Sequence, residues 1–193
     1  LDDAWMTHFS NALSGSLASL EELNLVGNRF GDSGMMAFSN ALSSGALQSL
    51  RTLDISHNTR ITTDGMIAFV NALTSASNLS MGLRVLRLSN CAIGIEAMQA
   101  FSKALSNGSL ASLQELRLHR NQVRDQGMIE FSSALASGAL TSLKILELSS
   151  NDLRSQEMMA FSRALSSGAL ASLQVLGLSQ NQIGDEGMKA FSS

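Results

Sequence analysis

A nine-residue leucine pattern occurs six times along the chain, and it constrains the fold more than any other feature. The pattern reads L-x-x-L-x-L-x-x-N with small changes. Successive copies begin 30, 33, 30, 30 and 30 residues apart, at Leu20, Leu50, Leu83, Leu113, Leu143 and Leu173. Self-similarity at such a period indicates a protein built by stacking one structural unit.

Each repeat combines two periods. In L-x-x-L-x-L the last two leucines alternate with another residue, which is typical of a short strand with one buried face. In residues 32–45 the apolar side chains recur at helical spacing and predict an amphipathic helix, with Met35, Phe38, Ala41 and Leu42 on its buried stripe. The predicted unit is therefore strand, turn, helix and loop, and the predicted fold class is α/β.

Local signals also predict where these helices begin and end. Asp32 is the predicted N-cap of the helix at 32–45, and Gly45 lies where a left-handed residue is needed after it. One unit alone buries too little apolar surface to offset the conformational entropy that it loses. Neighbouring units must share their cores, which predicts a quasi-one-dimensional solenoid.

These repeats resemble the leucine-rich repeat family, and within it the ribonuclease-inhibitor-like class. Repeats of that class are long, carry a helix on the outer face, and close the strand motif with Asn or Cys. The resemblance covers essentially the whole chain and implies a curved horseshoe, with parallel strands on the concave face and helices on the convex face. It also implies a buried ladder that bonds backbone groups of the turns, formed here by Asn28, Asn58, Cys91, Asn121, Asn151 and Asn181.

Both ends of the chain interrupt a repeat. Residues 1–6 align with residues 183–188, and the chain stops at residues 191–193, within a predicted helix. Solenoids need polar caps at their ends, and neither end resembles one. We therefore expect residues 1–193 to form a single array that is a segment of a longer one.

Composition excludes several classes of protein. The net charge is −3 and charged residues make up 15% of the chain, which argues against a nucleic-acid binder because such proteins need a basic stripe. A single cysteine, Cys91, excludes a disulfide framework and a cysteine-built zinc site. No apolar run approaches the ~20 residues of a membrane span. We expect an intracellular, cytoplasmic protein, and an organelle is also compatible with the sequence.

The sequence contains no catalytic constellation that we recognise. His8, His57 and His119 are the three histidines, and no cysteine or clustered histidine completes a metal set around them. Serines are abundant, yet the G-x-S-x-G turn that presents a nucleophile is absent. The recurrent G-D-x-G lacks the Lys-Ser/Thr of a phosphate-binding loop. The sequence therefore predicts no enzyme activity, no cofactor and no metal.

One exposed strand column is the candidate binding surface. It reads Asn24, Asp54, Arg87, Arg117, Glu147 and Gly177 along successive repeats. One interpretation is a ladder of compensated pairs, Asp54 with Arg87 and Arg117 with Glu147. The other is a basic centre that binds an acidic partner or an anion. The candidate partner-binding residues on the concave face are Asp54, His57, Arg84, Arg87, Arg117, His119, Arg120 and Glu147.

The sequence thus favours a non-enzymatic scaffold that binds a protein partner on its concave face. A structural or sensor subunit of a larger assembly is an alternative. A further alternative is a GTPase activator similar to the RanGAP family, which shares this repeat class. A second candidate surface is an apolar strip on the convex side, formed by Met36, Ile67, Ile129 and Met159.

Overall fold

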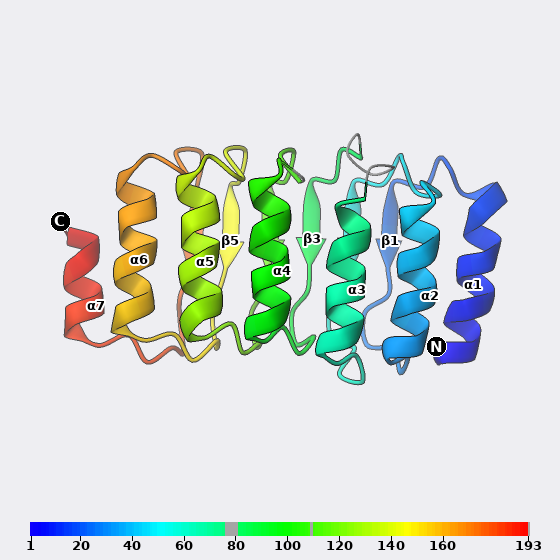
Figure 1. Cartoon of the computed structure of the whole chain (residues 1–193), viewed down its shortest axis with the longest axis horizontal. Helices are drawn as coiled ribbons and strands as arrows, with labels where there is room; N and C mark the ends of the chain where they lie inside the picture. Colours follow the sequence, from blue (N-terminus) through cyan, green and yellow to red (C-terminus); the bar gives the residue numbers. More distant parts are fainter. Residues whose placement is uncertain (76–80, 109, 193) are drawn as a thin grey trace.

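The computed structural model describes residues 1–75, 81–108 and 110–192. In this part of the chain one layer of strands lies against one layer of helices (Figure 1). The strands are β1 (Glu22–Asn24), β2 (Thr52–Asp54), β3 (Val85–Arg87), β4 (Glu115–Arg117), β5 (Ile145–Glu147) and β6 (Val175–Gly177). The helices are α1 (Asp3–Ser16), α2 (Asp32–Ser43), α3 (Thr63–Leu73), α4 (Ile95–Ser106), α5 (Asp125–Ala136), α6 (Ser155–Ser166) and α7 (Asp185–Lys189), and the 3-10 helix η2 (Ala190–Ser192) follows.

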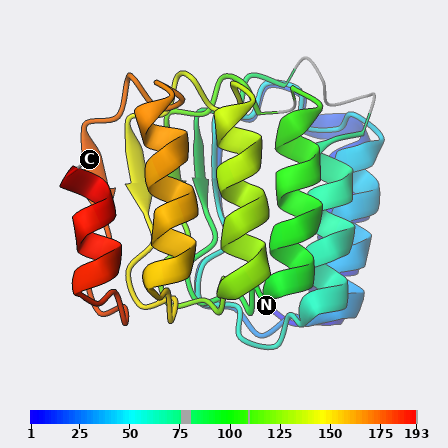
Figure 2. The ribbon, with the colours of Figure 1, turned by 60° about the vertical axis from the view of Figure 1, so that its left-hand side comes forward.

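The strands form one parallel sheet in sequence order, from β1 to β6. Every pairing has the same register, so the central leucines of successive strands stand side by side, as Leu23, Leu53 and Leu86 do. Parallel strands lie about 4.8 Å apart, whereas packed helices need about 8–10 Å between their axes. The helix layer is therefore the wider one, and the solenoid is curved with strands on the concave face and helices on the convex face (Figures 1 and 2).

The core lies between the two layers. The predicted stripe of α2 is buried, and the rings of Phe38 and Phe69 stack across α2 and α3. The methionine at the matching position is fully buried in α2 to α6, as Met35 and Met66 illustrate. Met188 is 55% exposed, because α7 has a helix on one side only (Figure 1). The predicted strand–helix repeat is confirmed.

One predicted cap is wrong, and the actual contact joins two repeats. The N-cap of α2 is Gly31, and Asp32 is the first helical residue. The Asp32 carboxylate instead accepts hydrogen bonds from the backbone N–H (2.7 Å) and the hydroxyl (2.6 Å) of Thr62, which precedes α3. Gly45 does adopt a left-handed conformation, with φ of 83°, as predicted.

Small residues near the start of several helices let neighbouring helices approach one another, whereas α6 carries Glu157 at the same position. A Cβ atom on Gly65 would collide with the Asp32 carboxylate and would lie 2.9 Å from Cγ2 of Ile61. The matching residue of α4 is Ala97, and α3 and α4 pack less extensively than α2 and α3 do. Glycine at this position therefore allows α2 and α3 to pack closely.

None of the helices in the described part of the chain has the length and apolar character needed to cross a bilayer.

Candidate functional site

The predicted asparagine column runs through the turns after the strands. The side-chain amide of Asn58 donates to the backbone carbonyls of Leu25 (2.9 Å) and Ile55 (2.7 Å), and its carbonyl oxygen accepts from the backbone N–H of Asn28 (3.0 Å). Each such side chain thus joins its own repeat to the preceding one. Asn121, Asn151 and Asn181 also donate to both repeats.

Cys91 occupies one position of this column and bonds more weakly. Its thiol donates to the carbonyl of Ile55 at 3.2 Å, and the N–H of Asn58 points at its sulfur, which is a poor acceptor. The residue is fully buried, and burial raises the pKa of the thiol to about 12. Within the described residues no three His, Cys, Asp or Glu side chains are grouped as a metal ion would require.

Most of the predicted binding residues gather on the concave face. They line two shallow hollows, of about 330 and 390 Å³, that share His57, Arg117 and His119. Asp54 and Arg87 add to the first hollow, and Arg120 and Glu147 add to the second. Arg84 lies outside both, because it precedes β3, whereas the hollows are lined by residues at the ends of the strands and in the turns after them. The structure therefore brings together seven of the eight predicted side chains.

Glu115 lies at the centre of this surface, and the sequence reasoning missed it. Oε1 of Glu115 accepts a hydrogen bond from Nε of Arg87 at 2.7 Å and another from Nε of Arg117 at 2.6 Å. The sequence could have placed Glu115 on the concave face, because residues two apart on a strand face the same side and Glu115 precedes Arg117 by two. The prediction considered only the column that follows the central leucine.

The predicted ion pairs are formed in part. Nη1 of Arg87 lies 3.9 Å from the Asp54 carboxylate. In the described part of the chain no ion pair joins Arg117 to Glu147, because the backbone N–H and hydroxyl of Ser149 bind the Glu147 carboxylate. This carboxylate also occupies the space where a Cβ of Gly177 would be. Glu147 thus leans toward β6, away from the arginine on β4.

Charge at this site is arranged in layers. The side chains of Arg87 and Arg117 are 34% and 38% exposed, whereas those of Asp54 and Glu115 are only 14% and 12% exposed. Burial disfavours ionisation of Glu115, but hydrogen bonds from both arginines outweigh it and hold its pKa below the usual value. The same hydrogen bond raises the pKa of Arg87. Glu115 therefore stays ionised beneath the two more exposed guanidinium groups.

Two histidines flank the arginines. Nδ1 of His119 lies 2.8 Å from the Ser89 hydroxyl, and Nδ1 of His57 lies 3.3 Å from the side-chain amide of Asn90. Burial lowers the pKa of His119, although the Glu147 charge acts in the opposite direction. His8 is exposed on α1, away from this surface.

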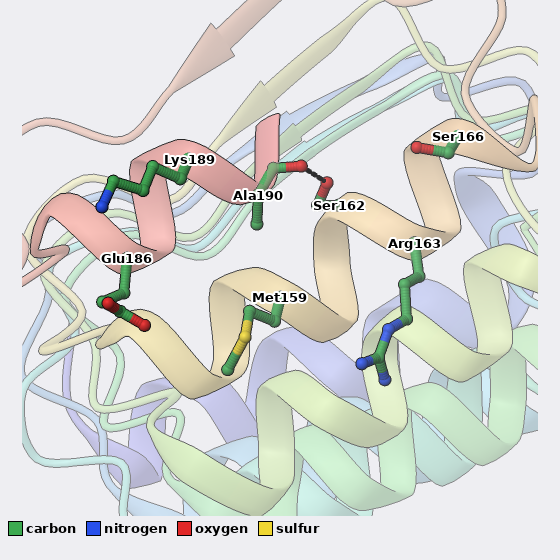
Figure 3. Close-up of a pocket in the computed structure, with 7 residues that line it drawn as sticks. All are labelled: Met159, Ser162, Arg163, Ser166, Glu186, Lys189 and Ala190. Atoms are coloured by element: carbon green, nitrogen blue, oxygen red, sulfur yellow. Dashed lines mark hydrogen bonds between the residues drawn. The ribbon is translucent and has the colours of Figure 1, made fainter. Parts of the chain in front are cut away.

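A third hollow, of about 470 Å³, lies on the convex side between α6 and α7 (Figure 3). The hydroxyl of Ser162 donates to the carbonyl of Ala190 at its edge. Glu186 and Lys189 come from α7, whereas Arg163 points away from them on α6 (Figure 3). These charged groups do not converge on one point. Met36 and Met159 of the predicted convex strip are exposed, and Ile67 and Ile129 are half-buried.

The geometry defines a class of protein, a solenoid of strand–helix repeats with an open concave face. The sequence profile described as "Leucine Rich repeat" matches residues 16–39, 46–70, 109–132, 139–162 and 169–192. These segments cover more than half of the chain, so it belongs to the leucine-rich repeat family. The ribonuclease-inhibitor-like class stays a prediction. No match falls on residues 71–108, which hold the longer spacing and Cys91.

Similarity to individual proteins is weaker. No curated protein sequence matches the chain. A chain in the crystal structure of the Rad7 and Elc1 complex from yeast is 12% identical, with a TM-score of 0.48, over 97% of this chain and 52% of that one. An internalin from Listeria monocytogenes is 15% identical, with a TM-score of 0.22, over 97% of this chain and 92% of the internalin. The chain spans about half the length of the Rad7–Elc1 match.

Proposed function

We propose that this chain is a non-enzymatic scaffold that binds a protein partner on its concave face. The observation that carries this proposal is the gathering of the predicted charged side chains in two adjoining hollows that share Arg117. Leucine-rich repeat proteins are typically binding scaffolds, and membership of that family supports the same function. A structural or sensor subunit and a GTPase activator stay predictions from the sequence.

The shape of the surface also suits a macromolecular ligand. The two hollows are open and shallow, whereas small-molecule sites are usually deep enough to bury most of their ligand. Side chains of moderate size, such as Thr52, Val85 and Ile145, continue the face along the strands. A partner can therefore lie across several repeats, with the arginines as anchors of the kind that hot spots favour.

Bulky substitutions on the two faces test this proposal. A concave-block variant carries Thr52→Trp and Ile145→Trp, and a matched convex-block variant carries Met36→Trp and Met159→Trp. Immobilised protein captures partners from native extract, and each captured protein is quantified by mass spectrometry. We expect the concave block to lower the specifically captured partner at least tenfold and the convex block to leave it unchanged.

Folding of each variant is checked by circular dichroism and thermal unfolding. Loss of the partner with the convex block and retention with the concave block would place the interface on the helices. The proposal would then be wrong.

A further inference from the structure

Arg87 and Arg117 are held in one orientation by a shared acceptor. Both use Nε to bond the same oxygen of Glu115, although each guanidinium has five N–H donors. In the described part of the chain the Nη groups of Arg117 have no protein acceptor, and Nη1 of Arg87 has only the distant carboxylate of Asp54. Two sets of terminal N–H groups are therefore fixed and available to a ligand.

The rest of the site adds to these donors. Arg120 is exposed beside them on the turn after β4, where its backbone is left-handed with φ of 56°. Glu147 leans away over Gly177, so it leaves the β5 side of Arg117 uncovered. Adjacent strands put the two arginines about 4.8 Å apart along the sheet. The solvent-facing layer of this site is thus cationic, although three carboxylates lie near it.

We propose that Arg87 and Arg117, oriented by Glu115 and flanked by Arg120, form a receptor for an acidic segment of the protein partner. The carboxylates of that segment approach from the solvent side and bind the Nη groups. This inference rests on the proposed function and names the chemistry of its partner. Glu115 acts as a positioning residue, because it orients the guanidinium groups and does not touch the ligand.

Carboxylates fit this site better than nucleic acid does. Single-stranded nucleic acid is held by aromatic side chains on which bases stack, together with an extended cationic groove. Residues lining the two hollows include no aromatic ring other than the imidazoles of His57 and His119, and the cations form one cluster. Arginine forks match carboxylates in a bidentate geometry. An extended acidic peptide can place successive side chains of one face over adjacent rungs of the sheet.

A direct binding measurement tests this receptor. The probe is a short fluorescent peptide of alternating glutamate and glycine, and its matched control has glutamine in place of glutamate. Anisotropy is measured at low ionic strength, since exposed charges are screened by salt. We expect the wild-type chain to bind the glutamate peptide at least tenfold more tightly than the glutamine peptide. Arg87→Gln and Arg117→Gln should each weaken that binding at least fivefold, and Arg163→Gln on α6 should leave it unchanged.

Glu115→Val separates positioning from net charge. Valine suits this column, which holds Val85 and Ile145 on the adjacent strands. The variant loses one negative charge, so attraction by net charge alone would tighten binding of the glutamate peptide. Loss of the shared acceptor frees both guanidinium groups, and we expect binding to weaken about threefold. Thermal unfolding confirms that the variant is folded, and tighter binding by it would overturn the positioning role.

The outcomes separate this inference from the proposed function. Equal binding of the two peptides would overturn the acidic receptor, and so would stronger competition by single-stranded RNA than by unlabelled glutamate peptide. A concave block that still abolishes partner capture would leave the proposed function standing in either case. Peptide binding that depends on Arg117, combined with partner capture that the concave block does not affect, would overturn the proposed function; the site would then still bind acidic peptides, but not a segment of that partner.

Discussion

The junction between α2 and α3 differs from the junction between α3 and α4, although both join consecutive repeats. At the first junction Gly65 allows close approach and Asn58 supplies an amide to the ladder. At the second, the matching residues are Ala97 and Cys91, and the repeat is three residues longer. A closed apolar void with no room for a water molecule lies there, lined by Met66, Ala97 and Met98 among others. Several departures from the repeat pattern thus coincide at this junction.

This difference predicts that stability is unevenly distributed along the solenoid. In stacked repeats each unit contacts only its neighbours, so stability is approximately a sum over units and junctions. Among the internal junctions, α3/α4 has weaker ladder bonds and the least extensive helix packing, so the interior of the array should open there first. The predictions that follow compare matched residues at the two junctions.

The largest difference should come from the ladder itself. Asn58→Ala removes the buried amide from the carbonyls of Leu25 and Ile55, each of which keeps one other donor, and leaves the backbone N–H of Asn28 without its acceptor. We expect a loss of about 2–3 kcal/mol in the free energy of unfolding. Cys91→Ala removes only weak sulfur contacts and should cost about 1 kcal/mol. Urea unfolding of both variants measures the two values. Equal losses would mean that the cysteine rung is as strong as the asparagine rung.

A smaller difference should come from the helix contacts. Gly65→Ala pushes a methyl group against Asp32 and Ile61 and should destabilise by about 1–2 kcal/mol. Ala97→Gly removes a methyl group at the looser junction, and the lower helix propensity of glycine should cost about 1 kcal/mol. Thermal unfolding of the two variants compares them. Stabilisation by Gly65→Ala would show that the helix approach at α2/α3 does not depend on glycine.

Reactivity of the thiol reports directly on the weaker junction. Since burial raises the pKa of Cys91 to about 12, the folded protein should react with a thiol reagent far more slowly than the protein unfolded in urea, at least a hundredfold. Labelling then measures how often this junction opens. Rapid labelling without denaturant would contradict the buried position of Cys91 in the ladder.

Much of the fold was predictable because repetition averages out local errors. Six copies of one pattern identify which leucines share a column, and the column of Asn58 and Cys91 follows from the same alignment. Asp32 was misassigned because an acidic residue at a helix start matches a local cap, whereas its partner Thr62 is a whole repeat away. Such a contact becomes visible only when the repeats are stacked.

The candidate surface was predictable in position but not in its connections. Alternation on a strand places Arg87 and Arg117 on the concave face. Which acid each arginine meets depends on side-chain conformation, and Glu147 has room over Gly177 only because that residue has no Cβ. Glu115, in the neighbouring column, takes the bonds that were assigned to Glu147.

The smallest expected effect concerns pH. Hydrogen bonds hold the pKa of Glu115 below its usual value, so its contribution to stability is present at neutral pH and is lost as the pH falls through the folded-state pKa. Glu115→Gln should therefore cost about 0.5–1 kcal/mol at pH 7, and the difference from wild type should shrink as the pH falls and vanish once Glu115 is protonated in the folded protein.

His119 makes the free energy of unfolding depend on pH in a second range. Burial lowers its pKa, so wild type and Glu115→Gln should both lose a little stability as the pH falls below about 6.5. A difference between them that stays constant as the pH falls through the acidic range would contradict the role of the Glu115 charge. Urea titrations across this pH range measure both effects.

The central claim is that the concave face, at Arg87 and Arg117, receives an acidic segment of a protein partner. Titration of the isotope-labelled chain with the glutamate peptide, followed by backbone amide chemical shifts in NMR, tests it most directly. We predict perturbed amides in β3, β4 and the turns after them, with the helices α2 to α6 unchanged. Perturbations confined to the helices, or an unperturbed spectrum at saturating peptide, would contradict the claim.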